Sequence, residues 1–526
     1  MSSRNLLLSL LSLFITFSIS AQWTADLGNG NYRNPIIHAD YSDPDVIRVG
    51  DDYWMVASSF TCMPGIPILH SKDLVNWEIV NHVYPSLPSG KYDRPAHGEG
   101  SWAPAIRHHD GMYYVYFCTP QDGLFVARAS DPRGEWELTQ MVEVAKWEDP
   151  CPFWDEDGNA YLAHSIHRGG PAIIHRMSAD GLRLLDNGKV VYHDEETNPI
   201  LEGLKMEKRD GWYYIFAPAG GVESGWQTVL RSRDIFGPYE ARRVMEEGDN
   251  GINGPHQGAL VETQTGEWWF INFQSKGIYG RVTHLQPAKW SSDGWIIIGE
   301  DNNGDGIGNP VLTYRKPDVG ATYPTVIPQT SDEFQDATPG KQWQWQSNPR
   351  AEWYSLSSRP GYMRLYSIPC PSEHGNLYYA GNLYLQKLPA PTFTAVTYLE
   401  SKFTADGERA GLIMMGNEYS YIALIGGSDG NRIAVVRGKY DKFAVVPEEV
   451  ASIPVATSSV WLKAELLNDH ECEYSYSTDG VTYHRLGEPC AVKPGMWIGA
   501  KIGIFSSSPN VVGSDGYADF DYFRIE

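Results

Sequence analysis

The chain has 526 residues, of which 42% are hydrophobic, and a formal net charge of −23 at pH 7. This length accommodates roughly two to four domains. The negative charge argues against nucleic acid or an anionic membrane surface as a partner, because both need basic patches on the protein. Aromatic residues make up 13% of the chain, an excess that suits β-sheet cores and also suits stacking against sugar rings.

The first 21 residues have the features of a secretory signal peptide. Arg4 precedes an apolar run from Leu6 to Phe17, and small residues precede Gln22. The run is too short for a helix that spans a bilayer, and no later stretch is long and apolar enough to do so. We therefore expect an exported protein, periplasmic or secreted, with no membrane among its partners.

The 6 cysteines are too sparse for a disulfide scaffold and show no CxxC spacing, so a zinc site is not indicated. Cys472 and Cys490 lie in a region of predicted strands. They form either a bridge between neighbouring strands or a pair of buried thiols, and the sequence leaves both alternatives open.

A turn followed by an aromatic strand recurs between Asn34 and Tyr323. Asp-Gly and similar turns precede runs of aromatic and β-branched residues, which is the pattern of β-hairpins. Units of roughly 50 residues with several short strands each are typical of propeller blades. Residues 22–325 are therefore predicted to form a five-bladed β-propeller. Its blade markers are Tyr53, Tyr113, Tyr161, Tyr213 and Trp268.

One chemically distinctive residue precedes each marker by about ten to twelve positions, as a count along the sequence shows. Because equivalent positions of successive blades surround a central channel, these residues should ring one end of it. The alternative is that they are turn residues that cap strands. The five residues are Asp43, Trp102, Asp149, Glu202 and His256.

Asp43 lies directly before Pro44 and a predicted strand. The proline fixes its own φ and disfavours the helical region for the residue before it. We therefore expect an extended backbone at Asp43 and a restricted direction for its carboxylate.

The three acids have the residue types that hydrolysis of a glycosidic bond requires. One carboxylic acid must protonate the leaving oxygen, and a second carboxylate must attack or activate water. Glu202 has the longer reach, which suits the proton donor, and Asp43 suits a base that holds one water. Asp149 lies between them in blade order and would orient the donor and raise its pKa as a like charge.

Arg281, His256 and Trp102 are candidates for contacts with the sugar or with a metal. Arg281 follows the last blade strand and would bind sugar hydroxyls or balance the acids; the alternative is a surface arginine. His256 would bind a metal through water or hydrogen-bond a carboxylate, although a lone histidine is weak support for a metal. Trp102 would form a stacking wall of the site or belong to the core.

Residues 317–339 are rich in Pro, Thr, Asp and Gly and indicate a domain boundary. Beyond it, alternating strands such as Tyr362–Tyr366, Gly411–Met415 and Trp461–Leu466 follow without helices. Residues 326–526 are therefore predicted to form one β-sandwich, which carries no obvious catalytic set.

Together, these motifs resemble glycoside hydrolase family 43. The resemblance covers residues 34 to about 315, and the C-terminal part is similar to the jelly-roll, concanavalin-like sandwich of the family's β-xylosidases and α-L-arabinofuranosidases. The resemblance implies a five-bladed propeller and single-displacement, inverting chemistry. It is carried by Ser42–Ile47, Pro64–Ser71, Trp102–Pro104, Glu148–Pro150, Glu202–Gly203 and Gly280–Arg281.

By position, the resemblance assigns Asp43 as general base, Glu202 as general acid and Asp149 as the residue that tunes the pKa of the acid. Arg281 matches the arginine on the substrate side, and His256 matches the histidine near a central hydrated calcium. We expect no required cofactor, with calcium as a structural ion only.

Two departures concern the sugar. Leu204-Lys205 stands after Glu202-Gly203 where the family often has Pro-His. Thr61–Met63 stands where xylosidase-like members carry aromatics before Pro-Gly. Both lie where the distal units of a substrate would bind. They leave the catalytic residues unchanged, but they leave open which sugar the site prefers.

The predicted function is an exo-acting inverting glycosidase that releases terminal α-L-arabinofuranosyl units from plant hemicellulose, as in xyloglucan or arabinoxylan side chains. β-D-Xylosidase activity is the close alternative, because the two sugars present similar hydroxyl arrangements. A retaining β-fructosidase would need an Asn-Asp-Pro-Asn motif, which is absent. A non-catalytic carbohydrate-binding protein would not need all three acids. The family resemblance disfavours an endo-acting arabinanase, because the appended sandwich then implies a blocked, pocket-like site.

Overall fold

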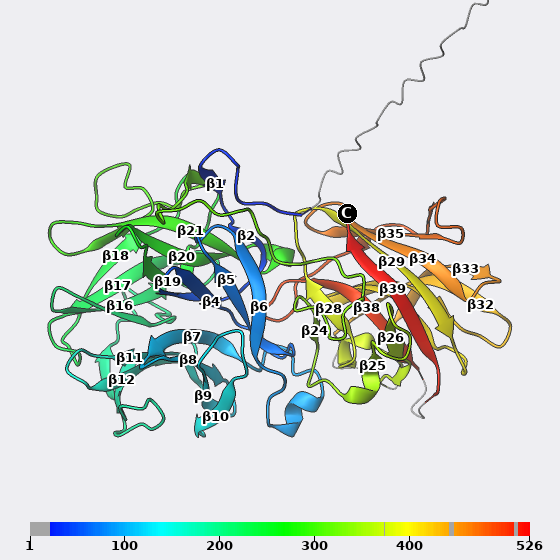
Figure 1. Cartoon of the computed structure of the whole chain (residues 1–526), viewed down its shortest axis with the longest axis horizontal. Coiled ribbons are helices and arrows are strands. Elements are labelled where there is room, and N and C mark those ends of the chain that lie inside the picture. The colour runs from blue at the N-terminus through cyan, green and yellow to red at the C-terminus, as the bar shows by residue number, and fades with distance from the viewer. Residues whose placement is uncertain (1–21, 373, 441–445, 510–513) are drawn as a thin grey trace, which may run out of the picture.

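The computed structural model describes residues 22–372, 374–440, 446–509 and 514–526. These residues form two lobes side by side, a propeller coloured blue to green in Figure 1 and a sandwich coloured yellow to red. Nearly all regular structure is β, as predicted. The short 3₁₀ helices are η1 (Gly90–Asp93), η2 (Gly277–Tyr279), η3 (Ala351–Trp353) and η4 (Leu377–Tyr379). The predicted signal peptide, residues 1–21, lies outside the described residues.

The propeller has five antiparallel blades, which confirms the predicted number. Four blades are built from consecutive strands. They comprise β3 (Asp45–Val49), β4 (Asp52–Val56), β5 (Gly65–Ser71) and β6 (Trp77–Tyr84); β7 (Trp102–His109), β8 (Met112–Thr119), β9 (Gly123–Ala129) and β10 (Glu137–Val142); β11 (Trp147–Trp154), β12 (Ala160–Ile166), β13 (Ala172–Met177) and β14 (Lys189–Tyr192); and β15 (Lys205–Arg209), β16 (Trp212–Ala219), β17 (Trp226–Ser232) and β18 (Glu240–Met245).

The fifth blade joins the two ends of the propeller sequence. It contains β19 (His256–Glu262), β20 (Trp268–Ser275), β21 (Arg281–Trp290) and β22 (Ile296–Ile298), and its outer neighbour is β2 (Ile37–Asp40) from the start of the chain. Because β2 pairs with β21, an N-terminal strand closes the ring. A small ribbon of β1 (Asn31–Arg33) and β23 (Thr313–Arg315) lies beside it.

Each aromatic marker is the first or second residue of the second strand of its blade. Their side chains belong to apolar clusters that span neighbouring blades. The first strand of each blade is the innermost one, since β3 contacts both β7 and β19. The residues expected to ring the channel therefore come from the beginnings of the innermost strands or from the turns just before them.

The described residues of the sandwich form two sheets of eight strands each. One sheet contains β24 (Gln344–Trp345), β27 (Ile368–Pro369), β28 (Tyr384–Lys387), β30 (Arg409–Met415), β31 (Glu418–Ile425), β32 (Asn431–Lys439), β33 (Glu448–Val455) and β38 (Lys501–Ser508). The other contains β25 (Tyr354–Ser355), β26 (Met363–Tyr366), β29 (Phe393–Lys402), β34 (Ser459–Leu466), β35 (Glu471–Ser477), β36 (His484–Arg485), β37 (Cys490–Ala491) and β39 (Tyr517–Ile525). The boundary predicted after residue 325 falls between β23 and β24.

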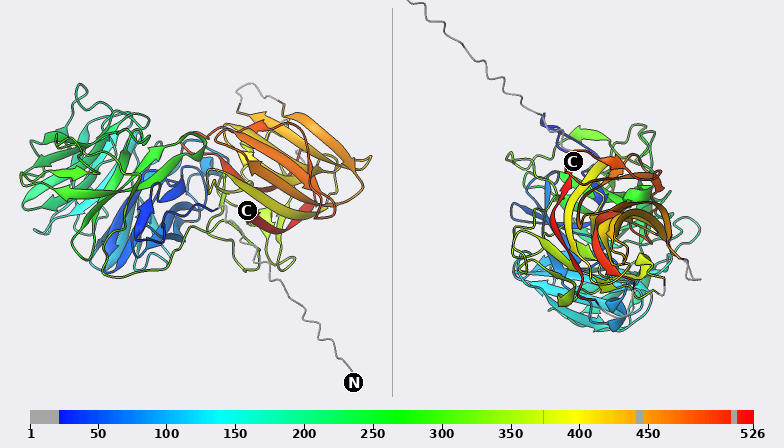
Figure 2. Two further views of the ribbon diagram at one scale, coloured as in Figure 1. Left: turned by 90° about the horizontal axis from the view of Figure 1, so that it is seen from above. Right: turned by 90° about the vertical axis from the view of Figure 1, so that its right-hand side faces the viewer.

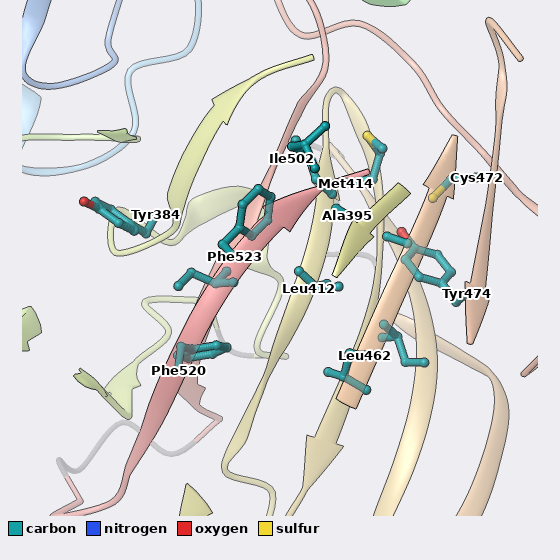
Figure 3. Packing of buried hydrophobic residues seen from close by; sticks show 14 of the residues in the cluster. Tyr384, Ala395, Leu412, Met414, Leu462, Cys472, Tyr474, Ile502, Phe520 and Phe523 are labelled. Carbon is teal, nitrogen blue, oxygen red and sulfur yellow. The ribbon is translucent and has the colours of Figure 1, made fainter. Parts of the chain in front are cut away.

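The core of the sandwich lies between its sheets (Figure 3). Leu462, Ala464 and Leu466 alternate along β34 with more exposed residues, and they meet Leu412 and Ile502 of the facing sheet. This alternation places one face of each strand in the core, which is the pattern that predicted the sandwich.

The two lobes follow each other along the longest axis of the molecule and are in direct contact (Figure 2). Backbone hydrogen bonds join Met63 of the propeller to Trp345 of the sandwich, and Tyr279 of the propeller packs into the sandwich core. The lobes therefore form a continuous structure rather than two units joined only by a linker.

All 6 cysteines are buried and free. Cys472 and Cys490 are directly opposite each other on β35 and β37, so the structure has the second of the two predicted alternatives, a pair of buried thiols. Among the described residues, no helix has the length and apolar character needed to cross a bilayer.

Candidate active site

The innermost strands begin with an irregularity that turns side chains toward the channel. Asp43 has φ 54° and Asp149 has φ 57°, both in the left-handed region, and Ala103 has φ 35° at the matching place of the second blade. The strand register also shifts between Trp102 and Ala105 and between Glu148 and Cys151. Bulges of this kind re-aim side chains beside active sites, and their backbone strain is held by the surrounding structure.

The expectation of an extended backbone at Asp43 is therefore wrong. The preference that Pro44 imposes is local, and tertiary hydrogen bonds override it. The Ser58 backbone N–H donates to the carbonyl oxygen of Ser42 at 2.9 Å, and the Ser58 hydroxyl donates to the Asp43 carboxylate at 2.6 Å. The direction of the carboxylate is restricted, as expected, but by these partners rather than by the proline.

A pocket of about 380 Å³ lies at this end of the propeller. Five of the six predicted site residues line it. They are Asp43, Trp102, Asp149, Glu202 and Arg281. The sequence-distant acids thus converge on one cavity, and the alternative that they only cap strands does not describe them.

Asp43 is 4% exposed and accepts three side-chain hydrogen bonds. Ser42 and Ser58 donate to Oδ2 at 2.7 and 2.6 Å, and Arg281 Nη1 donates to Oδ1 at 2.8 Å. The Arg281 guanidinium is itself largely buried, so the surface-arginine alternative does not apply. These donors hold the carboxylate in one orientation facing the pocket.

Glu202 has a pKa raised to about 8. Burial is the main cause, and the charges of Asp149 and Asp43 add to it, while the Arg281 cation opposes it. A carboxyl group with this pKa keeps its proton near neutral pH and can donate it.

Asp149 lies beside this acid and fixes the backbone next to it. Its Oδ2 accepts the backbone N–H of Gly203 at 2.6 Å, and Gly203 directly follows Glu202. Burial raises the pKa of Asp149 to about 6, against the opposing charge of the buried Lys205. Asp149 is therefore placed both to orient the Glu202 segment and to raise the pKa of its carboxyl group.

His256 lies beneath this group rather than in the pocket wall. It is fully buried, its Nε2 is 3.5 Å from Glu202 Oε1, and neither ring nitrogen has a hydrogen-bond partner among the described residues. Burial lowers its pKa to about 3, so the ring is neutral. A neutral, unpaired and buried imidazole fits the water-mediated calcium contact implied by the resemblance, and His256 would hold that hydrated ion.

Trp102 forms part of the pocket wall, with its indole N–H donating to the Gly98 carbonyl oxygen at 3.0 Å. Its ring lies 5.1 Å from the ring of His167, centroid to centroid. His167 also lines the pocket. A flat aromatic wall of this kind is suited to stacking against a sugar ring.

The sequence did not point to Glu148 as a site residue, although it adjoins Asp149. Glu148 is 4% exposed, and carboxyl oxygens of Glu148, Asp149 and Glu202 lie within 4.8 Å of one another. Its pKa is raised to about 10 by burial and by the charges of these two neighbours, and His167 lies 2.9 Å away. The adjacent acids Glu148 and Asp149 were a signal for a second buried acid. Adjacent acids are also typical of solvent-exposed turns, so the sequence did not distinguish the two.

Trp497 was also missed. It belongs to the sandwich, has φ 64°, and lines the pocket opened by the propeller. No periodicity or spacing could have found it, because its role depends on how the lobes contact each other.

The comparisons with known proteins agree with this geometry. The family model described as "Glycosyl hydrolases family 43" matches residues 32–296, and the one described as "Beta xylosidase C-terminal Concanavalin A-like domain" matches residues 331–526. The chain belongs to glycosyl hydrolase family 43. The resemblance predicted from the motifs is thereby confirmed for both lobes.

Relatives within family 43 align along nearly the whole chain. A protein of Xylanibacter ruminicola, whose name marks it as a candidate β-xylosidase, is 43% identical over 496 residues, covering 92% of this chain and 87% of its own. A β-xylosidase of Formosa agariphila is 34% identical, covering 95% and 91%. A non-reducing end α-L-arabinofuranosidase of Bacteroides ovatus is 28% identical, covering 95% and 96%.

A solved structure gives the same picture for the fold of this family-43 chain. The crystal structure of a xylan β-1,4-xylosidase from Bacillus halodurans superposes with a TM-score of 0.82 at 25% sequence identity. The match covers 94% of this chain and 99% of that one, so the arrangement of both lobes is shared.

Proposed function

We propose that this family-43 glycosidase is an exo-acting, inverting β-D-xylosidase that releases terminal xylosyl units from oligosaccharides of plant hemicellulose. The observation that carries the reaction is the convergence of Asp43, Asp149 and Glu202 on one pocket, where burial raises the pKa of Glu202 to about 8. The relatives at 43% and 34% identity support the sugar, since both are named for β-xylosidase activity.

The roles follow from what each group can do with a proton. Glu202 keeps its proton near neutral pH and would donate it to the glycosidic oxygen as the bond to the anomeric carbon breaks. Asp43, held by its three donors, would accept a proton from the water that attacks the opposite face of that carbon. One displacement then inverts the anomeric configuration.

The other pocket residues would support these two. Asp149 would orient the segment of Glu202 and keep its pKa high, and Arg281 would position Asp43 while facing the sugar. Trp102 would provide an apolar face for the sugar ring. Because the pocket excludes water from the Arg281 guanidinium and the Asp43 carboxylate, the attraction between these two charges is stronger than it would be in water.

Calcium at the centre of the propeller remains a prediction. When bound, it would supply positive charge that offsets the negative charge of the acids. The contribution of this chain is the neutral His256, whose ring nitrogens are buried and have no hydrogen-bond partner among the described residues, with Nε2 3.5 Å from Glu202 Oε1.

α-L-Arabinofuranosidase activity, the main expectation from the sequence, is the second candidate. The relative from Bacteroides ovatus carries that activity in its name and spans 95% of this chain. Its identity of 28% is lower than those of the two xylosidase-named relatives, so we rank this activity below β-xylosidase. Export, and a plant cell-wall saccharide as the substrate, also remain predictions.

Two aryl glycosides measured side by side test the proposal. We expect kcat/KM for 4-nitrophenyl β-D-xylopyranoside to exceed that for the α-L-arabinofuranoside by at least about tenfold, the size of difference that one pocket contact can produce. The reverse order would favour the second candidate, and no release from either would defeat the exo-acting glycosidase. Proton NMR of the first product should show α-xylose; β-xylose would contradict the inverting mechanism.

A further inference from the structure

Asp40 is a buried carboxylate that contacts both lobes but does not line the pocket. It is the last residue of β2, the strand that closes the propeller ring, and it is 4% exposed. Its Oδ1 accepts the backbone N–H of Arg281 at 2.9 Å, and its Oδ2 accepts the backbone N–H of Gly499 at 3.0 Å. One side chain therefore joins the strand of the active-site arginine to a loop of the sandwich.

On the propeller side, Asp40 is two hydrogen bonds away from the proposed base. It holds the backbone of Arg281, and the Arg281 guanidinium holds Asp43 at 2.8 Å. The fit is close, because a Cβ at Gly280 would lie 2.4 Å from Asp40 Oδ1. Movement of the Asp40 carboxylate would therefore shift the start of β21 and with it the guanidinium.

On the sandwich side, Gly499 follows two residues after Trp497, which lines the pocket. The loop is pressed against the propeller, since a Cβ at Gly499 would lie 2.7 Å from the backbone nitrogen of Gly280. The next residue donates its backbone N–H to the Ile278 carbonyl oxygen at 2.7 Å. Trp497 itself is 50% exposed, so the anchored segment contributes to its position together with the partial burial of its ring.

The charges across this contact are complementary. Lys387 and Lys501 of the sandwich are directly opposite each other on β28 and β38. Burial lowers the pKa of Lys387 to about 8; the Lys501 cation adds to this effect, and the Asp40 carboxylate opposes it. Asp40 thus supplies a negative charge where the sandwich brings two buried or half-buried cations to the interface.

We infer that Asp40 is a positioning residue that holds Arg281 and the Trp497 segment in one arrangement, so that the sandwich lobe helps to set the geometry of the active site. The inference rests on the proposed function for its kinetic consequences. The coupling of two backbone segments through the Asp40 carboxylate does not depend on which sugar the enzyme releases.

The test compares Asp40→Asn with Asn348→Ala. The amide is isosteric but presents an N–H₂ group to one of the two backbone N–H donors, so one hydrogen bond is lost. Asn348 is the matched control, because it also joins the lobes, with hydrogen bonds to the backbone of Leu87 at 3.0 and 2.9 Å, yet neither residue lines the pocket.

In hydrogen exchange followed by mass spectrometry, Asp40→Asn should speed exchange in the segments 277–283 and 495–501, and Asn348→Ala should not. Asp40→Asn should also lower kcat/KM on the aryl xyloside by about 10- to 100-fold, because small misplacements of catalytic groups cost that much. A larger share should fall on kcat than on KM, since Asp43 acts in the chemical step. In a cycle with Trp497→Ala, the two losses should combine to less than their product.

Unchanged exchange in both segments would overturn the inference, as would equal kinetic losses in Asp40→Asn and Asn348→Ala at equal loss of thermal stability. If Asp40→Asn does not fold, Gly499→Ala displaces the same loop from the opposite side and should give the same exchange and kinetic pattern. Absence of glycosidase activity in the parent enzyme would defeat the proposed function, while the exchange comparison would still decide the role of Asp40.

Discussion

The interiors of the two lobes are built from different chemistry. Around the propeller pocket, Glu148, Asp149 and Lys205 are all at most 5% exposed. Within the part of the chain that the structure describes, Glu148 Oε1 and Lys205 Nζ have no hydrogen-bond partner. Between the sandwich sheets, the buried side chains are mainly apolar, as Leu462 and Phe520 illustrate (Figure 3). Burying charged or unpaired polar groups costs stability, whereas burying apolar groups provides it.

This difference indicates that the propeller end is arranged for reactivity and the sandwich core for stability. A change in the pocket should therefore alter catalysis without unfolding the protein, and a change in the sandwich core should do the opposite. At the interface around Asp40, a substitution is expected to affect both catalysis and stability.

The largest effect should come from Glu202→Gln, which removes the proposed proton donor. We expect kcat to fall by about 10²- to 10⁴-fold on xylobiose, because its leaving group needs protonation. The loss should be smaller on an aryl xyloside whose phenol leaves readily. Steady-state kinetics on both substrates measure the difference.

Glu207→Gln provides the matched control for this change. Glu207 lies on β15, just after Glu202, and lines a cavity at the other end of the propeller channel. It should keep kcat close to that of the parent. Equal losses on the two substrates in Glu202→Gln would argue against its role as acid.

Much of the propeller could be predicted from the sequence, because each blade repeats a hairpin turn and an aromatic strand. The repeat also places Asp43, Asp149 and Glu202 at equivalent positions of their blades, and equivalent positions of successive blades lie close together around the central channel. The local backbone at Asp43 was not predictable in this way, since tertiary hydrogen bonds from Ser58 override the preference set by Pro44.

Residues that act through contact between the lobes left no signal in the sequence. Trp497 lines the pocket only because the sandwich packs against the propeller, and Asp40 matters only through its two backbone partners. The sugar specificity was also beyond the motifs, because it depends on pocket shape rather than on the acids that perform the chemistry.

Phe520→Ala should produce the largest change in stability. Phe520 is fully buried in the sandwich core, and truncating such a ring typically costs about 3–5 kcal/mol in free energy of unfolding, since a cavity remains. Thermal or urea denaturation measures this loss. At temperatures where the variant is folded, KM and kcat should stay near the parent values, and a large kinetic loss there would mean that core packing itself shapes the pocket.

The pH dependence of catalysis should show the raised pKa of Glu202, about 8. Because the donor must be protonated, kcat/KM should fall by about tenfold per pH unit above this value. A profile on the aryl xyloside from pH 5 to about pH 10 measures the alkaline limb. The limb should be absent in Glu202→Gln, and its persistence there would assign the titration to another group.

Glu148→Gln should make a smaller change, and in the stabilising direction. The pKa of Glu148 is raised from 4.5 to about 10 in the folded protein. Between these values the unfolded chain releases the proton and the folded chain keeps it, so this group lowers stability progressively as pH rises through the window. An amide of the same shape has no such proton to release.

The variant should therefore be more stable than the parent by at least about 1 kcal/mol at pH 8, the equivalent of one pKa unit, and the gain should disappear below about pH 4.5. Urea denaturation at both pH values measures it. A surface control such as Glu137→Gln, whose carboxylate is largely exposed in an ion pair with Arg128, should show no comparable gain. A loss of stability at pH 8 in Glu148→Gln would mean that the contact with His167 outweighs the cost of the buried acid, and the contrast between the two lobes would then be weaker than their burial patterns indicate.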